Sequence, residues 1–247
     1  MRIGKWIKKV SVIVVAMSIF NLAGCSGTNE RQAKQMTDAL KEKYGIEFKV
    51  SLIGNRWNQD SATLICYPKD DPELRFTTRL YKDGTIWEEY IRRAIGRQVE
   101  NLVNSKFRER GIDSQVYASF SGIKPSIFGA VVPSLQDVIK NNDLKTFNGD
   151  IILPDSFRLQ ADAAEIISEI YQELYKEFGN TRFGVEIGFI ADEEFEKASQ
   201  NLRASYSSAG DGWYADYTVT SRFRLSIDEN GLSETIEELK ELLKGDK

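Results

Sequence analysis

The sequence predicts an α+β protein in which antiparallel sheets pack against helices. Several short segments alternate apolar and polar residues with a period of two, as half-buried strands do. Between them, longer segments repeat apolar residues every three or four positions, as amphipathic helices do. Most of the predicted strands are joined by short links, which favour antiparallel pairing because parallel strands need long crossovers.

The first predicted helix covers residues 33–44 and places Met36, Leu40 and Tyr44 on one face. Gly45 ends this helix, since glycine readily adopts the left-handed conformation of a helix C-terminus. Three strands are expected next, over residues 47–53, 62–67 and 74–81. The short links between them predict an antiparallel meander.

A long helix is predicted over residues 86–110, after a turn at Lys82–Gly84. Thr85 and Glu88 have the spacing of a capping box, in which each side chain accepts a hydrogen bond from the other residue's backbone. Apolar residues follow one face of this helix until Gly111. The sequence therefore predicts a helix that begins directly at the capping box.

Residues 121–132 are the predicted domain boundary, because glycine and proline interrupt the periodicity there. The division gives an N-terminal half, 33–121, and a C-terminal half, 133–247. Segments 40–45 and 174–179 are similar, since each ends a helix with an aromatic residue and glycine before a strand pattern. Two similar halves would explain this similarity; chance, or one continuous mixed sheet, is the alternative.

The C-terminal half alternates further predicted helices and strands. Helices are expected over residues 134–142, 162–178 and 193–202, and strands over 150–153, 182–190 and 217–227, with 157–159 as an additional short strand. A final helix begins after a cap at Ser233 and contacts the core through Ile236, Leu239 and Leu243.

Residues 1–24 have the three zones of a secretory signal peptide. A basic start is followed by an apolar run of 11 residues, 10–20, and then by small residues. As a helix the run would rise only about 16 Å, against roughly 30 Å of hydrocarbon, so it is short for a permanent span. The basic flank predicts that the rest of the chain is exported.

The segment ends in Leu22, Ala23, Gly24 and Cys25. This sequence resembles the lipobox of bacterial lipoproteins, which reads leucine, a small residue, glycine or alanine, and cysteine. The resemblance covers about a tenth of the chain. It implies a diacylglyceryl thioether on Cys25, cleavage before Cys25, and a protein held by palmitate-type acyl chains at the extracytoplasmic face of the cell membrane. An uncleaved signal anchor with an incidental cysteine is the alternative.

Residues 25–32 are then a short polar tether, which predicts a folded part close to the bilayer. The formal charge of the whole chain is −4, from 33 basic and 37 acidic residues. Without the four basic residues of the signal peptide, the mature charge is about −8. An acidic protein gains nothing from phosphate neutralisation, so we expect no nucleic-acid partner.

The chain contains no histidine, which excludes Ser-His-Asp and Cys-His catalysis and the usual histidine-containing zinc sites. Once Cys25 is acylated, Cys66 is the remaining cysteine, so no intramolecular disulfide is expected. Cys66 lies in an apolar strand pattern, which favours a buried small hydrophobe over an exposed thiol. No phosphate-binding loop or nucleophile elbow is present. We therefore expect no cofactor, no metal and no catalytic residue.

The best candidate for a binding surface is the segment over residues 203–214. Tyr206, Trp213 and Tyr214 stand there among serine, glycine and alanine, a composition typical of adaptable recognition loops. The alternative is a long connection whose Trp213 packs into the core. Trp57, in the loop after the first strand, is a second and weaker candidate.

These observations together predict a lipid-anchored, extracytoplasmic, non-enzymatic protein that binds a protein partner or a small ligand. One alternative is a carboxylate-based hydrolase of the cell envelope, which would need two acids converging in a cleft. The other is the solute-binding subunit of a transporter, which would need repeated strand–helix alternation in two domains.

Overall fold

The computed structural model describes residues 27–54, 60–122, 128–141 and 146–245. They belong to two compact units. The first combines residues up to Asp70 with Thr78–Trp87, and the second combines Asp71–Thr77 with Glu88–Lys247. The chain therefore divides between residues 70 and 88, and not at 121–132. The strand before the expected boundary pairs with the strand after it, so that boundary lies within one sheet.

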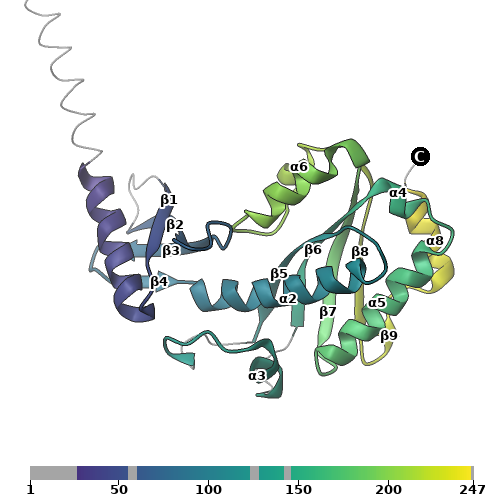
Figure 1. The fold of residues 1–247 in the computed structure, drawn as a ribbon, viewed down its shortest axis with the longest axis horizontal. Helices are drawn as coiled ribbons and strands as arrows, with labels where there is room; N and C mark the ends of the chain where they lie inside the picture. Colours follow the sequence, from purple (N-terminus) through teal and green to yellow (C-terminus); the bar gives the residue numbers. More distant parts are fainter. Residues whose placement is uncertain (1–26, 55–59, 123–127, 142–145, 246–247) are drawn as a thin grey trace, which may run out of the picture. The chain divides into compact units, whose positions relative to one another are not determined.

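The first unit contains a helix and most of a four-stranded sheet (Figure 1). Residues 27–44 are helical, so the helix includes six residues, 27–32, that we expected in the polar tether. Its Met36 and Leu40 are buried, as their spacing predicts. The strands are β1 (Phe48–Ile53), β2 (Ser61–Pro68), β3 (Phe76–Tyr81) and β4 (Ile86–Glu88). Consecutive strands are neighbours in the sheet, as expected for a meander.

The capping box predicted at Thr85 does not form, because the chain continues as β4 and helix α2 begins only at Tyr90. The backbone groups of Thr85 close a turn instead: its carbonyl accepts a hydrogen bond from the Tyr81 amide at 2.9 Å. Gly84 supplies the positive φ of +88° that this turn needs. The Glu88 carboxylate accepts a hydrogen bond from the Tyr90 amide at 2.6 Å, at the start of a helix that begins four residues later than predicted.

Cys66 is fully buried on β2, which confirms its prediction as a small hydrophobe. Its Sγ lies 3.5 Å from Oγ1 of Thr78, whose hydroxyl donates to the Leu64 carbonyl. Burial raises the pKa of the Cys66 thiol to about 11, so the thiol stays protonated at neutral pH.

The second unit is built on a five-stranded sheet with the order β5-β6-β7-β8-β9. Its strands are β5 (Gln115–Ser121), β6 (Thr146–Pro154), β7 (Arg182–Ile190), β8 (Val219–Asp228) and β9 (Gly231–Leu232). The pair β6 and β7 is parallel, with helix α5 (Ala163–Glu177) in the crossover, and the other pairs are antiparallel. The α+β class is thus confirmed. The two units differ in sheet size and topology, so the similarity of segments 40–45 and 174–179 is local.

Three short helices complete the described elements of this unit around the long ones: α3 (Leu135–Lys140), α4 (Asp155–Arg158) and α7 (Asp211–Tyr214). The strand expected at 157–159 is wrong, because α4 occupies this position. The Asp155 carboxylate binds the Arg158 guanidinium within that turn at 2.7 Å, which favours a helical turn over an extended strand.

Helices cover both faces of the five-stranded sheet (Figure 1). On one face, an aromatic cluster joins α5 to the strands, with Phe147 and Phe178 centroids 4.2 Å apart and Tyr171 and Phe183 centroids 5.2 Å apart. Helix α8 (Ile236–Lys244) packs beside α5. Its N-cap is Thr235, and not Ser233 as expected, because the true capping box pairs Thr235 with Glu238.

On the opposite face, helix α6 (Asp192–Arg203) buries Ala198 and Leu202 against the sheet. These side chains pack on Tyr117 of β5, Ile152 of β6 and Ile190 of β7. None of the helices in the described part of the chain is long and apolar enough to cross a bilayer.

Helix α2 (Tyr90–Arg108) packs against the outer edge of β5. The Glu100 carboxylate, 1% exposed, accepts from the Ala118 amide of β5 at 2.9 Å. Arg93 binds the same carboxylate at 2.7 Å, and Arg97 lies 3.3 Å from it. An unpaired strand edge is a site of aggregation, and this buried carboxylate fills one of its open hydrogen-bonding positions.

We expect Glu100→Gln to lower the free energy of unfolding by about 3 kcal/mol, because the buried Arg93 and the half-buried Arg97 lose their counter-charge. Urea unfolding measures the effect. The matched control is Glu109→Gln at the exposed C-cap of the same helix, which should change stability by less than about 0.5 kcal/mol. Equal effects of the two substitutions would contradict the role given to Glu100.

Candidate functional site

The binding residues predicted from the sequence have different fates in the structure. Cys25 and Trp57 lie outside the described residues. Tyr206, Trp213 and Tyr214 belong to the segment between α6 and β8, residues 204–218, which we call the α6–β8 connection. Tyr206 is 44% exposed, whereas Tyr214 is 4% exposed and forms part of the core. Tyr214 therefore offers no binding surface in this conformation, contrary to the prediction.

Trp213 is half-buried and lies at the border between core and surface. Its ring meets Tyr214 edge-on with centroids 5.1 Å apart, and Tyr217 at 4.7 Å. The Tyr217 hydroxyl accepts from the Asn201 side chain of α6. These aromatic contacts attach the connection to α6. They correspond to the alternative given for Trp213, a packing role. Tyr206, by contrast, is exposed.

A buried carboxylate lies beneath the connection. Asp150 stands on β6 and is 3% exposed. Its Oδ2 accepts a hydrogen bond from the Ala209 amide of the connection at 2.9 Å. Ala209 itself is buried in the cluster that also contains Tyr214 and Leu202. The middle of the connection is therefore fixed to the sheet through one carboxylate.

Burial raises the pKa of Asp150 to about 6, because the ionised form loses hydration. The hydrogen bond from Ala209 and the positive charge of Arg222 oppose this shift without cancelling it. An Asp side chain ordinarily titrates near 3.8, so this group changes its charge close to neutral pH.

Tyr214 covers the neighbouring part of the sheet. A Cβ atom at position 188 would lie 2.6 Å from the Tyr214 ring, so glycine on β7 is what allows the ring to approach the strand. The buried Tyr214 hydroxyl has no hydrogen-bond partner among the residues that the structure describes. Burial and the nearby Asp150 raise the Tyr214 pKa, so the phenol stays neutral. The Tyr214 hydroxyl is thus a second buried polar group with incomplete hydrogen bonding, in addition to the Asp150 carboxylate.

Arg222 of β8 also contacts this group of residues. Its guanidinium stacks on the Tyr214 ring at 4.3 Å from the ring centroid. It also pairs with Glu186 of β7 and, at 2.7 Å, with the exposed Asp211 of α7. We call Asp150, Glu186, Tyr214 and Arg222 the Asp150 cluster.

The Asp150 cluster was not predicted from the sequence. Gly149-Asp150 before an apolar run has the composition of a turn, so the strand was expected to begin at Asp150 when β6 in fact begins at Thr146. The alternation of apolar and polar residues predicts β8, but it does not indicate which residues Arg222 contacts. The only available signal was an aspartate at the edge of a strand pattern, a residue type depleted in strands.

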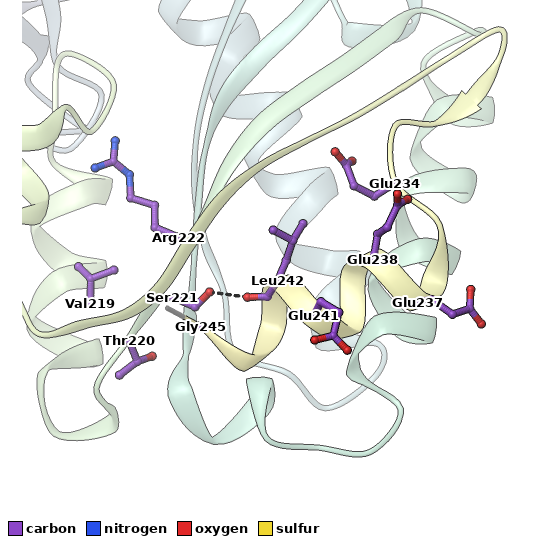
Figure 2. A pocket seen from close by; sticks show the side chains of 10 residues that line it. All are labelled: Val219, Thr220, Ser221, Arg222, Glu234, Glu237, Glu238, Glu241, Leu242 and Gly245. Carbon is purple, nitrogen blue, oxygen red and sulfur yellow. Dashed lines mark hydrogen bonds between the residues drawn. The ribbon is translucent and has the colours of Figure 1, made fainter. Parts of the chain in front are cut away.

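A pocket of about 830 Å³ lies elsewhere in this unit, between β8 and α8 (Figure 2). Glu234, Glu237, Glu238 and Glu241 line it, and the Ser221 hydroxyl donates to the Leu242 carbonyl at its floor. Glu238 belongs to the capping box and Glu241 pairs with Lys244, so both carboxylates have structural partners. The Arg222 side chain points away from them (Figure 2). We therefore place the candidate site at the connection.

Among the described residues, no group of three acidic, cysteine or histidine side chains could hold a metal ion. The candidate site contains the exposed Tyr206, the half-buried Trp213 and the Asp150 carboxylate, whose pKa is raised to about 6. Such a site is suited to contact with a partner.

Comparison with known proteins identifies a relative in fold. The chain is similar to the crystal structure of a DUF5037 family protein from Ruminococcus gnavus, with a TM-score of 0.67 and 17% sequence identity. The similarity covers 87% of this chain and 99% of the other. No family model matches the sequence, and no curated protein does. At this identity, the similarity concerns the fold alone.

The raised pKa of Asp150 predicts how stability depends on pH. The folded protein holds this proton more tightly than the unfolded chain, so the stabilisation is complete below pH 3.8 and is lost as the pH rises through about 6. We expect Asp150→Asn to be more stable than the wild type at pH 7.5, by about 3 kcal/mol at most, with the difference vanishing towards pH 4. Urea unfolding at several pH values measures it. Asp211→Asn serves as an exposed control, and a less stable Asp150→Asn at pH 7.5 would be contradictory.

Proposed function

We propose that the protein is a lipid-anchored, extracytoplasmic and non-enzymatic binding protein. The observation that carries the proposal is the signal-peptide pattern ending in Leu22-Ala23-Gly24-Cys25. Two or three acyl chains on one cysteine hold a protein stably on a bilayer, whereas one chain is marginal. Residue 27 is already helical, two positions after Cys25 in the sequence.

The α6–β8 connection is the proposed contact surface. Tyr206 is 44% exposed there, next to a half-buried Trp213. Tyrosine and tryptophan give a large contact area for little conformational entropy, and they are enriched in the centres of protein interfaces. The connection is fixed at Ala209 and at Thr218, whose amide donates to Glu194 at 2.6 Å. A fixed frame with an exposed tyrosine favours the binding of a protein partner.

A carboxylate-based hydrolase is the second candidate, and one observation favours it. Asp150 and Glu186 are register partners on the parallel strands β6 and β7. Asp150 has a raised pKa, whereas Glu186 pairs with Arg222, so the two carboxyl groups lie in different environments, as those of a catalytic acid and base do. Against it, Asp150 is 3% exposed beneath the connection, so a substrate could not reach it in this conformation.

A solute-binding subunit of a transporter has less support. The strands of the first unit follow one another as neighbours in a four-stranded sheet, without a helix between consecutive strands. The repeated strand–helix alternation expected for that class is therefore missing from the described part of this unit.

We expect Cys25→Ala to abolish incorporation of a fatty-acid probe and to move the protein from the membrane to a soluble fraction. Metabolic labelling followed by fractionation measures both. The thiol of Cys66 is buried, so Cys66→Ala is the matched control and should keep the label. Label that persists in Cys25→Ala would end the proposal of lipid anchoring.

We expect Tyr206→Ala to reduce retrieval of the partner at least ten-fold, since interface tyrosines often contribute about 1.4 kcal/mol or more. The acylated protein is cross-linked and captured from its own membranes, and partners are quantified by mass spectrometry. Leu159→Ala removes an exposed apolar side chain, 68% exposed, from another surface of the same unit and is the control. An identical partner set for wild type and Tyr206→Ala would contradict the proposed surface.

A further inference from the structure

We propose that Asp150 is a proton-controlled latch of the α6–β8 connection: its protonated form holds the connection closed, and its ionised form favours opening. This inference concerns the regulation of the same surface and rests on the proposed function only for its biological consequence. The physical claim is about one carboxylate and the segment that covers it.

The cover of Asp150 is supplied by the connection itself. The Ala209 amide is bound to Oδ2 at 2.9 Å, and Tyr214 lies near enough for the carboxylate to affect its titration. Below the carboxylate are the strands of the sheet, which do not move away without unfolding. Opening the connection is therefore the local route by which Asp150 reaches water.

The buried group has little compensation in its ionised form. The Ala209 amide donates one hydrogen bond to the Asp150 carboxylate. The Tyr214 hydroxyl, buried in the same cluster, donates to none of the described residues. Arg222 is committed to Glu186 and Asp211 and stacks on the Tyr214 ring. An ionised carboxylate in this position thus gains by opening, because opening returns it to water.

Linkage fixes the direction. In the closed conformation Asp150 has a pKa of about 6, and a solvated aspartate has a value near 3.8. The closed conformation therefore binds the proton more tightly, so acidification favours closure and neutral pH favours opening. Between pH 5 and pH 7.5 the opening equilibrium constant should rise about ten-fold.

Other titratable groups face Asp150 or hold the connection. Glu186 and Arg222 form an ion pair. Tyr117 on β5 has a pKa raised to about 12 by burial, so this phenol does not change its charge in this range. Asp211 is exposed. Glu194 holds the Thr218 amide, and that hydrogen bond lowers its pKa, so it weakens the connection only at lower pH. The window from pH 5 to 7.5 isolates Asp150.

The consequence concerns the proposed contact surface. Tyr206 precedes the latched residue Ala209 by three positions, and Trp213 and Tyr214 follow it. A closed connection presents Tyr206 in one fixed arrangement, whereas an open one also releases the buried Tyr214. A protein at the outer face of a membrane meets variable pH, and this cluster would couple that pH to the conformation of the surface.

Amide hydrogen exchange on the full acylated chain in detergent micelles tests the latch. Protection factors of residues 204–218, each corrected for the intrinsic exchange rate at the same pH, should fall about ten-fold from pH 5 to pH 7.5. Asp150→Asn should show no such change. Asp216→Asn, which removes an exposed carboxylate from the same segment without touching Arg222, should keep the full ten-fold change. The amides of Ile151 and Ile187 in the sheet report global unfolding and must stay more protected than the connection.

Protection that does not change with pH in the wild type, or that changes equally in Asp150→Asn, overturns the latch. If Asp150→Asn does not fold, the wild type and Asp216→Asn still decide, because a pH-independent wild type is sufficient to reject the latch. The measurement needs no partner, so the latch can fail while Tyr206→Ala still abolishes partner capture. Equally, the latch can hold while capture is unaffected by Tyr206.

Discussion

The five-stranded sheet of the second unit has two faces and a long free edge to cover, and most of the local structure follows from how each is covered. Apolar packing from α5 and α8 covers one face. Helix α2 covers the edge of β5, where Glu100 accepts from a strand amide while two arginines balance its charge. The remaining face is covered by α6 and by the α6–β8 connection, and there a carboxylate is buried with far less support.

The two buried acids, Glu100 and Asp150, show how context decides the effect of a buried charge. Glu100 contacts two guanidinium groups and a backbone amide, so its negative charge is balanced by opposite charge and by a hydrogen bond. Asp150 has one amide donor, and its nearest arginine is shared with other carboxylates. A buried charge is stable when it is paired and hydrogen-bonded, and expensive otherwise. We interpret the poorly supported acid as the functional one, because proteins tend to sacrifice stability at functional sites.

Periodicity predicted the elements whose residues report their own environment. Helix α5, strand β7 and strand β8 were found close to their expected bounds because large apolar residues recur in each with the period of its structure. The helix caps predicted at Thr85-Glu88 and at Ser233 were wrong. Several residues near a helix start can serve as caps, and the one used depends on where the preceding turn ends. The division between the units was also missed, since it depends on which strands pair across long sequence separations.

The candidate site was less accessible from the sequence than the fold. Composition draws attention to the α6–β8 connection because this segment mixes aromatic with small residues, and Tyr206 is exposed there. Tyr214 could not be separated from Trp213 by composition, because its burial depends on a glycine on β7. Asp150 lies 59 residues from Ala209, so their contact appears only when β6 and the connection are brought together.

The most direct measurement is the titration of the Asp150 carboxyl carbon, followed by nuclear magnetic resonance in the acylated protein and assigned by its loss in Asp150→Asn. A midpoint near pH 6 is the result expected for a carboxylate buried beneath the connection. A midpoint near 3.8, the value of a solvated aspartate, would mean that the connection does not bury this group and would remove the basis of the proposed regulation.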